Sequence, residues 1–218
     1  MNSRLELPRV YPITDRKLSG LSHAEQVRRL AAAGAALIQL REKHLPADQF
    51  YAEAVNAVAA AREAGVILLI NDRVDIAKMT GADGVHLGRD DLPPAAARQL
   101  LGRDAIIGLS THSITEATAA AREPVDYVAF GPIFRTDTKP DTEPVVGLGQ
   151  LAEIRNALPN IPLVAIGGIN AENITAVIEA GADSAAVISS AVAGGENIAK
   201  NLALLKTAAN GSQPSGAK

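Results

Sequence analysis

The stretch MTGADGVHL, residues 79–87, joins the end of a helix-like segment to a short apolar run. Two similar stretches occur elsewhere in the chain, AAGAALIQL at residues 32–40 and EAGADSAAVI at residues 179–188. In each of them a glycine stands where a helix should stop, at a position that tolerates left-handed backbone. The three stretches therefore predict a repeated joint between a helix and the strand that follows it.

Short apolar runs recur along the whole chain. Each is too short for a core helix and none alternates cleanly, so we interpret them as strands buried on both faces, as in parallel sheets. The eight runs are RVYPIT (9–14), ALIQL (36–40), VILLI (66–70), GVHL (84–87), AIIGL (105–109), YVAF (127–130), PLVAI (162–166) and SAAVI (184–188). Helix-like segments lie between most of them, and Ser22–Glu25 and Ser113–Glu116 fit the capping box of a helix start.

Eight strands that alternate with helices in about 200 residues predict a single-domain (β/α)8 TIM barrel, which we assign to residues 1–208. A doubly wound open sheet is the alternative. It is weaker because no G-x-G-x-x-G follows the first strand and because the strand count closes at eight. Residues 209–218 are small and polar, and we expect them to form a disordered tail.

The composition excludes several functional classes. A formal charge of −3 argues against a general nucleic-acid binder, and the lack of cysteine excludes disulfides and thiolate chemistry. No apolar stretch reaches the roughly 18 residues that span a bilayer, and the first residues do not resemble a secretion signal. We expect a cytoplasmic protein that acts on small molecules and binds neither nucleic acid nor membrane; a homo-oligomer is compatible with the sequence.

Polar residues follow most of the apolar runs, where a barrel builds its active site. Arg41 and Lys43 lie two residues apart, so both side chains should point the same way if the strand continues and could bind one anion. A solvated loop with a salt bridge to Glu42 explains them as well. Gly167–Gly168 and Ser189–Ser190 match the phosphate site of many barrels, and the alternative is a tight turn followed by a helix cap.

Two aspartates follow neighbouring strands and are candidates for a metal site. Asp72 comes after the third run and Asp91 just past the fourth, and a few carboxylate oxygens completed by water and phosphate suit Mg²⁺. A surface pair with Arg73 is the alternative for Asp72, and a helix cap is the alternative for Asp90 or Asp91. His86 lies inside an apolar run, where a hydrogen-bonded core role is the commoner one, so we do not assign it as a catalyst.

A long connection rich in proline and threonine runs from Gly131 to Gly147. Loops of more than about 12 residues in a compact domain are usually functional or disordered. Lys139 offers a cation for a phosphate, and Thr136 and Thr138 offer hydroxyl groups. With the other strand ends, this loop predicts two phosphate sites, one of them metal-assisted, and hence a two-substrate reaction in which a departing pyrophosphate is stabilised.

These residues together resemble the thiamine phosphate synthase family, also called thiamine-phosphate pyrophosphorylase. QLREK, INDRVDIA, GVHLG followed by DD, GPIF with TDTK, AIGGI and VISS occur in the family's order over nearly the whole chain. The resemblance implies a transferase of thiamine biosynthesis. It would join an aminopyrimidine methyl diphosphate to a thiazole phosphate, carboxylated or not, and release pyrophosphate by a dissociative, Mg²⁺-assisted substitution.

The resemblance also implies a role for particular residues. One Mg²⁺ per active site would bind Asp72 and Asp91, and the catalytic residues would be Lys139, Ser110, Arg41 and Lys43. The pyrimidine diphosphate would bind Gln39, Leu40, Arg41, Glu42, Lys43, Asn71, Ser110 and Lys139. The thiazole phosphate would bind Thr136, Asp137, Thr138, Gly168, Ile188 and Ser189.

Three alternatives remain at this point. Another phosphosugar barrel, such as an epimerase, would share the Gly168 and Ser189 site but would not explain the pyrophosphate cluster. A related thiazole tautomerase branch carries a histidine in the segment that corresponds to GPIF, where this chain has Pro132. A non-catalytic, ligand-sensing barrel would not need the metal-assisted site formed by Asp72, Asp91 and Lys139. Arg89 departs from the glutamine that often stands at its position in the family.

Overall fold

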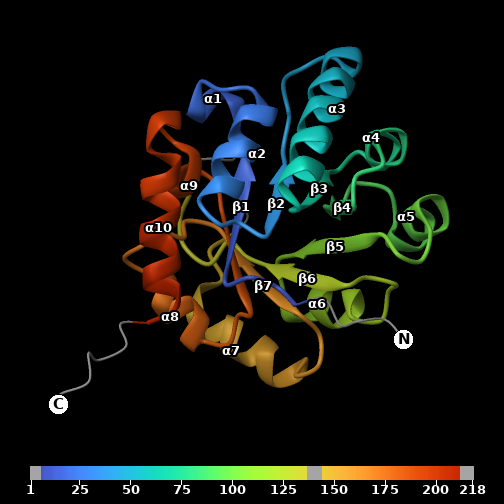
Figure 1. Cartoon of the computed structure of the whole chain (residues 1–218). Coiled ribbons are helices and arrows are strands. Elements are labelled where there is room, and N and C mark those ends of the chain that lie inside the picture. Colours follow the sequence, from blue (N-terminus) through green and yellow to red (C-terminus); the bar gives the residue numbers. More distant parts are fainter. Residues whose placement is uncertain (1–5, 137–143, 212–218) are drawn as a thin grey trace.

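The protein, described by a computed structural model over residues 6–136 and 144–211, is a closed barrel of eight parallel strands in chain order (Figure 1). β8 pairs with β1, which confirms the predicted TIM barrel and is incompatible with an open doubly wound sheet. Each predicted apolar run contributes one strand. The strands are β1 Val10–Thr14, β2 Leu37–Leu40, β3 Ile67–Asn71, β4 Gly84–Leu87, β5 Ile106–Thr111, β6 Tyr127–Phe130, β7 Leu163–Ile166 and β8 Ser184–Val187.

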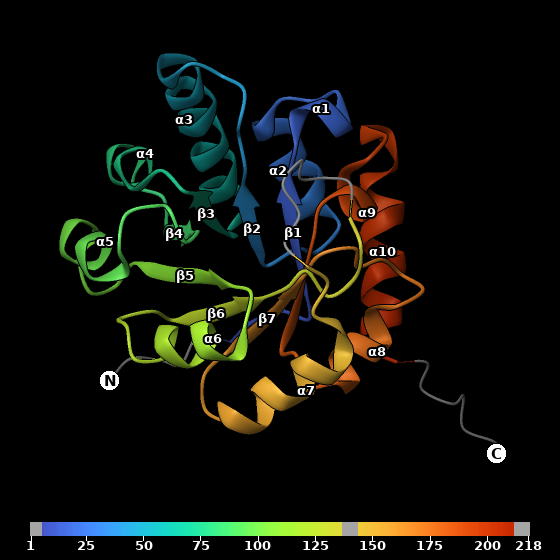
Figure 2. The same cartoon turned by 180° about the vertical axis from the view of Figure 1, so that it is seen from behind.

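Helices cover the outside of the barrel, and Figures 1 and 2 show the last helix, α10, returning beside α2. In the described ranges no helix is long and apolar enough to cross a membrane. The tail assigned to 209–218 begins at the last residue of α10, and residues 212–218 lie outside the described residues. The helices are α1 Arg16–Ser19, α2 His23–Ala32, α3 Ala47–Ala64, α4 Val74–Thr80, α5 Pro94–Leu101, α6 Ile114–Ala120, α7 Gly147–Ala157, α8 Ile174–Glu179, α9 Ser189–Val192, the 3-10 helix η1 Gly195–Asn197, and α10 Ile198–Ala209.

The core has two layers because successive strand residues point to opposite faces of the sheet. The larger layer fills the space between strands and helices, and it contains Leu40, Ile70 and Val85. The smaller layer lies inside the barrel, where Tyr11 and Tyr127 are its largest side chains. The interior is therefore packed, and the chemistry is confined to the ends of the strands.

The predicted joint between helix and strand is confirmed. Gly81 and Gly181 have φ values of 66° and 108°, which suit glycine at the end of a helix. Two residues later, the carboxylate of Asp83 accepts the amide of Leu68 at 2.8 Å, and that of Asp183 accepts the amide of Leu163 at 2.8 Å. Each aspartate thus bonds the strand before its own and fixes the register of the pair.

The two predicted helix starts are also confirmed in part. The Ser22 and Ser113 hydroxyl groups accept the amides of Glu25 and Glu116 at 3.2 Å, as the capping box requires. The reciprocal glutamate bonds differ: Glu25 pairs with Arg29, and Glu116 accepts the amide of His112 rather than that of Ser113. A cation one turn away competes for the Glu25 carboxylate.

Gly84 at the start of β4 should tolerate no side chain. A Cβ there would lie 1.9 Å from the carbonyl oxygen of Ile106 in the neighbouring strand. We expect Gly84→Ala to lower the free energy of unfolding by about 3 kcal/mol, measured by urea denaturation.

Gly149 provides the matched control. It is an exposed glycine in α7, and among residues 6–136 and 144–211 a Cβ added to it would meet no side chain or strand within 4 Å. Gly149→Ala should raise stability by about 0.5–1 kcal/mol, because alanine loses less backbone entropy in a helix. Equal effects of the two changes would contradict this account of β4.

Candidate active site

The predicted site residues converge at one rim of the barrel because they follow the carboxyl ends of parallel strands. Arg41 follows β2, Asp72 follows β3, Asp91 comes after β4, and Ser110 lies near the end of β5. Closure of the barrel brings these four side chains from separate parts of the chain to the same rim. The first expectation about the site, a shared location, is met.

Arg41 is held by a nearly buried ion pair. Its guanidinium donates to the Asp15 carboxylate at 3.1 Å, and the two side chains are 9% and 12% exposed. The other Asp15 oxygen accepts the amides of Lys17 and Leu18, so the same carboxylate caps α1. Asp15 has no role predicted from the sequence, because its contact with Arg41 depends on β1 and β2 being neighbours.

The Glu42 side chain is mostly buried and is not freely solvated. Its carboxylate accepts the amides of His44 and Leu45 at 2.7 and 3.2 Å, and it meets the buried His23 ring at 3.2 Å. The other nitrogen of that ring contacts the Thr14 hydroxyl at 2.7 Å. Burial acts to raise the pKa of the Glu42 carboxyl, but these hydrogen bonds outweigh it and leave the pKa below its ordinary value. Glu42 therefore shapes the turn after β2.

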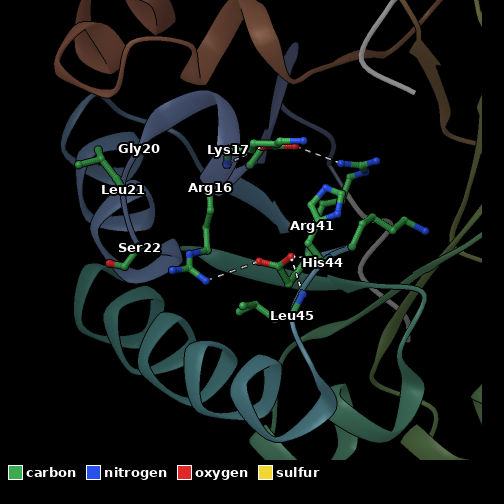
Figure 3. A pocket seen from close by; sticks show the side chains of 11 residues that line it. Arg16, Lys17, Gly20, Leu21, Ser22, Arg41, His44 and Leu45 are labelled. Atoms are coloured by element: carbon green, nitrogen blue, oxygen red, sulfur yellow. Dashed lines mark hydrogen bonds and ion pairs between the residues drawn. The ribbon is translucent and has the colours of Figure 1, made fainter. Parts of the chain in front are cut away.

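A pocket of about 360 Å³ opens beside these residues (Figure 3). Four cationic side chains line it, Arg16 and Lys17 from α1 and Arg41 and Lys43 from the segment after β2, together with the carboxylates of Asp15 and Glu42. The Arg16 guanidinium lies 4.0 Å from the Glu42 carboxylate, and that of Arg41 lies 3.1 Å from the Asp15 carboxylate. Figure 3 shows how the labelled Arg16 and Arg41 lie in this pocket. The pocket is rich in cations and suits an anion.

Lys43 turns to the opposite side from Arg41. Its ammonium lies 2.5 Å from the Asp72 carboxylate after β3, whereas Arg41 reaches Asp15 after β1. The expectation that the two side chains point the same way does not hold, because β2 ends at Leu40 and the strand alternation stops there. The two cations instead flank the end of β2.

Asp72 and Asp91 are neighbours in the structure. Burial raises the pKa of the Asp91 carboxyl, and the Asp72 charge and hydrogen bond raise it further, against the opposing bond from the Gly88 amide at 2.7 Å. Asp72 has a φ of 63°, a left-handed conformation uncommon outside glycine. In the described parts of the chain, no group of three or more His, Cys, Asp or Glu side chains could hold a metal. Two adjacent carboxylates fit Mg²⁺, which keeps several water and phosphate ligands.

The other described residues of the expected pyrimidine diphosphate site are Gln39, Ser110, Asn71 and Leu40. Gln39 is 2% exposed and donates to the Tyr11 hydroxyl inside the barrel at 2.9 Å, and Ser110 contacts the His86 ring at 2.8 Å. Asn71, 8% exposed, lies at the end of β3. The Leu40 side chain packs in the outer core layer, so only its backbone faces the rim.

The expected thiazole phosphate site lies across the rim. Gly168 has a φ of 65°, and a Cβ there would lie 2.5 Å from the carbonyl oxygen of Arg135. Ser189 is exposed at the first residue of α9, and Ile188 precedes it as the N-cap residue. The Ser190 hydroxyl donates to the Ile169 carbonyl at 2.8 Å and so ties α9 to the loop after β7. These contacts bring the predicted glycine and serine segments together.

The loop after β6 is described only in part. Pro132 to Thr136 approach the loop after β7, where the amides of Ile133 and Phe134 donate to the carbonyls of Ile166 and Gly167. Asp137, Thr138 and Lys139 lie outside the described residues, so their roles stay predictions. The Arg89 guanidinium lies 4.0 Å from the Glu116 carboxylate of α6.

Residues 10–191 match the model of a family described as thiamine monophosphate synthase. The thiamine-phosphate synthase of Chloroflexus aurantiacus is 47% identical over 186 residues, which cover 85% of each chain. That of Syntrophomonas wolfei is 49% identical over 181 residues, or 83% of this chain and 86% of the relative.

Solved structures agree with this comparison. The thiamine phosphate pyrophosphorylase of Pyrococcus furiosus superposes with a TM-score of 0.82 at 37% identity and covers 93% of this chain and 95% of its own. A structure described as native KDPGal has a TM-score of 0.73 at 17% identity and covers 96% and 98%. The second likeness is one of fold alone.

The contacts of Glu42 predict a structural cost when it is removed. Glu42→Ala should lower the free energy of unfolding by about 2–3 kcal/mol, because it leaves two amides and a buried imidazole without their acceptor. Lys43→Ala, which removes a more exposed pair, should change it by less than about 1 kcal/mol. Chemical denaturation of both variants measures the difference, and a loss for Lys43→Ala as large as that for Glu42→Ala would oppose this assignment.

Proposed function

The chain belongs to the thiamine monophosphate synthase family, and we propose that its rim joins an aminopyrimidine methyl diphosphate to a thiazole phosphate. It is a thiamine-phosphate synthase, a transferase of thiamine biosynthesis that releases pyrophosphate. The observation that carries the assignment of the site is the adjacency of Asp72 and Asp91 beside Lys43. The names of the relatives favour this activity over a tautomerase or a ligand sensor.

Asp72 and Asp91 would hold one Mg²⁺ and leave most of its coordination to water and the diphosphate. When bound there, the ion would supply Lewis-acid stabilisation for the charge on pyrophosphate as its carbon bond breaks. Lys43 and Arg41 add cations to either side of the end of β2, and Lys139 would add another from the loop after β6. This arrangement stabilises a leaving group.

The reaction we propose is dissociative. Pyrophosphate leaves first, the aminopyrimidine stabilises the resulting cation, and the thiazole nitrogen then attacks the carbon. Thr14, His23 and Glu42 form a hydroxyl–imidazole–carboxylate series, but the Thr14 hydroxyl is fully buried and cannot reach a substrate. The proposed pathway requires no protein nucleophile. The protein's remaining tasks are to align the two substrates and to exclude water from the cation.

The thiazole phosphate would bind opposite the diphosphate. Gly168, Ile188 and Ser189 would present backbone amides and a hydroxyl group to its phosphate, with Thr136, Asp137 and Thr138 closing the site from the neighbouring loop. The tie between Ser190 and Ile169 supports this proposal because it holds the two phosphate-binding segments in one relation.

Pyrophosphate release by the purified protein tests the proposed function. With both substrates and Mg²⁺, we expect pyrophosphate and thiamine phosphate to appear in equal amounts, and chelation of the metal should lower the rate by about 100-fold or more. Thiazole phosphate binding without any pyrophosphate release would instead favour the tautomerase or sensor alternatives.

Substitution of the aspartates tests the metal site. Asp72→Asn and Asp91→Asn should each lower kcat/KM by about 100-fold at a fixed Mg²⁺ concentration, because each removes one anionic ligand. Asp90→Asn is the matched control, since Asp90 is an exposed neighbour, and its activity should stay within about twofold of the wild type.

Stability measurements separate loss of chemistry from loss of fold. Asp72→Asn and Lys139→Ala should lower turnover far more than the free energy of unfolding. Losses of activity that track losses of stability, or an Asp90→Asn enzyme as slow as Asp91→Asn, would argue that these residues support the fold instead.

A further inference from the structure

A continuous chain of hydrogen bonds crosses the barrel interior from β2 to β5. Its members are all side chains, and only the last one, Ser110, lies at the partly exposed mouth. In order, Gln39 Nε2 contacts the Tyr11 hydroxyl at 2.9 Å, that hydroxyl contacts the Tyr127 hydroxyl at 3.1 Å, the Tyr127 hydroxyl contacts His86 Nδ1 at 2.8 Å, and His86 Nε2 contacts Ser110 Oγ at 2.8 Å. The hydrogen bonds thus connect Gln39 and Ser110, the residues at the two ends, which the family resemblance assigns to the pyrimidine diphosphate.

The register of the strands makes this chain possible. Gly108 of β5 pairs with His86 on one side and with Tyr127 on the other. Because Gly108 has no side chain, the two rings meet across it, 5.6 Å apart and 20° from parallel. A Cβ on Gly108 would lie 2.0 Å from the Tyr127 ring. The glycine therefore permits contact between two strands that are not neighbours.

The direction of the hydrogen bonds follows from the donors. The Gln39 amide nitrogen can only donate, so the Tyr11 oxygen accepts from it and the Tyr11 proton is left for Tyr127. Tyr127 then gives its own proton to His86 Nδ1, and His86 carries its proton on Nε2. If every hydrogen bond from Ser110 to Tyr11 ran in the opposite direction, the buried Tyr11 proton would have no acceptor among these five side chains. An unpaired buried donor costs free energy.

Both phenols remain donors under working conditions. Burial raises the pKa of the Tyr11 hydroxyl to about 12 and also raises the pKa of the Tyr127 hydroxyl. Each therefore carries one proton at neutral pH, and each proton has one place in the sequence of bonds. The order of donors does not depend on a charged member.

We propose that this series of hydrogen bonds fixes His86 in the neutral Nε2–H tautomer. The Ser110 oxygen then accepts from His86, and the Ser110 hydroxyl directs its own proton to the departing diphosphate. The proposal rests on the proposed function for the identity of the anion. Tyr11, Tyr127 and His86 act through Ser110 and are positioning residues. With the other tautomer, His86 Nε2 would accept the Ser110 proton, and the hydroxyl would turn its lone pairs towards the anion.

The consequence for the reaction is a donor that is oriented before charge develops. A hydroxyl group fixed as a donor stabilises an oxygen more strongly as that oxygen gains negative charge, so the benefit appears in kcat rather than in KM. A hydroxyl that must first break a bond to His86 loses part of this benefit. The chain thus links a buried network to the chemical step.

The tautomer of His86 is directly measurable in the free protein. In ¹⁵N-labelled protein the protonated and unprotonated ring nitrogens differ strongly in chemical shift, and loss of one set of signals in a His86→Gln variant assigns the residue among the four histidines. We expect a protonated Nε2 and an unprotonated Nδ1. An Nδ1–H tautomer or a doubly protonated ring at pH 7.5, roughly one unit above the ordinary histidine pKa, would overturn the proposal.

Removal of a single hydroxyl tests the order of the bonds. Tyr127→Phe keeps the ring and takes away the donor to Nδ1, so His86 should become a mixture of tautomers. The kcat of the Tyr127→Phe variant should fall about tenfold, which is less than the loss typical when a donor to the transition state is deleted. Its KM for the diphosphate substrate should stay within about twofold of the wild-type value. Tyr51→Phe, at a partly buried tyrosine that packs on the outer core, should change neither readout.

A double variant distinguishes action through Ser110 from a general structural effect. Ser110→Ala combined with Tyr127→Phe should be no slower than Ser110→Ala alone, because the same donor is already lost. Multiplicative losses would overturn the proposal. The tautomer measurement needs no substrate, so absence of synthase activity would refute the proposed function while leaving the His86 result to be judged separately.

Discussion

Closure of β8 onto β1 is the constraint on which the site depends. The pairing makes the sheet continuous, and the carboxyl ends of all eight strands then surround one opening. Arg41, Asp72, Asp91 and Ser110 are separated along the chain by tens of residues, yet each needs only to follow its own strand to reach that opening. The backbone thus positions the site, and local side-chain contacts such as Arg41 with Asp15 refine it.

Because side chains alternate along a strand, adjacent residues of the barrel face different layers. Gln39 faces the barrel interior and enters a polar network, whereas Leu40 packs between sheet and helices. The alternation ends with the strand. Beyond it, ion pairs set the directions of the side chains, so that Arg41 turns to Asp15 and Lys43 turns to Asp72. A single five-residue stretch therefore serves the core, the outer layer and the site.

The sequence predicted the fold because its signals are local and repeated: short apolar runs, glycines at helix ends, and serine caps. It also predicted which strand ends carry the candidate site residues. It did not reveal that Glu42 binds His23, or that Tyr11 meets Tyr127, because those contacts depend on register and on packing between distant segments. The divergence of Arg41 and Lys43 escaped prediction because it requires the exact end of β2. Asp137, Thr138 and Lys139 keep their predicted roles as proposals.

The aspartates of the helix-to-strand joints have a consequence for how the barrel divides. Asp83, Asp126 and Asp183 each accept an amide from the strand just before their own, so β3 with β4, β5 with β6, and β7 with β8 form bonded pairs. A break in the connection between β4 and β5 would cut none of these pairs. Each half-barrel fragment would keep its own aspartate-to-amide hydrogen bonds and expose edges complementary to the other fragment. This connection is therefore the natural place to split the chain for reassembly from two pieces.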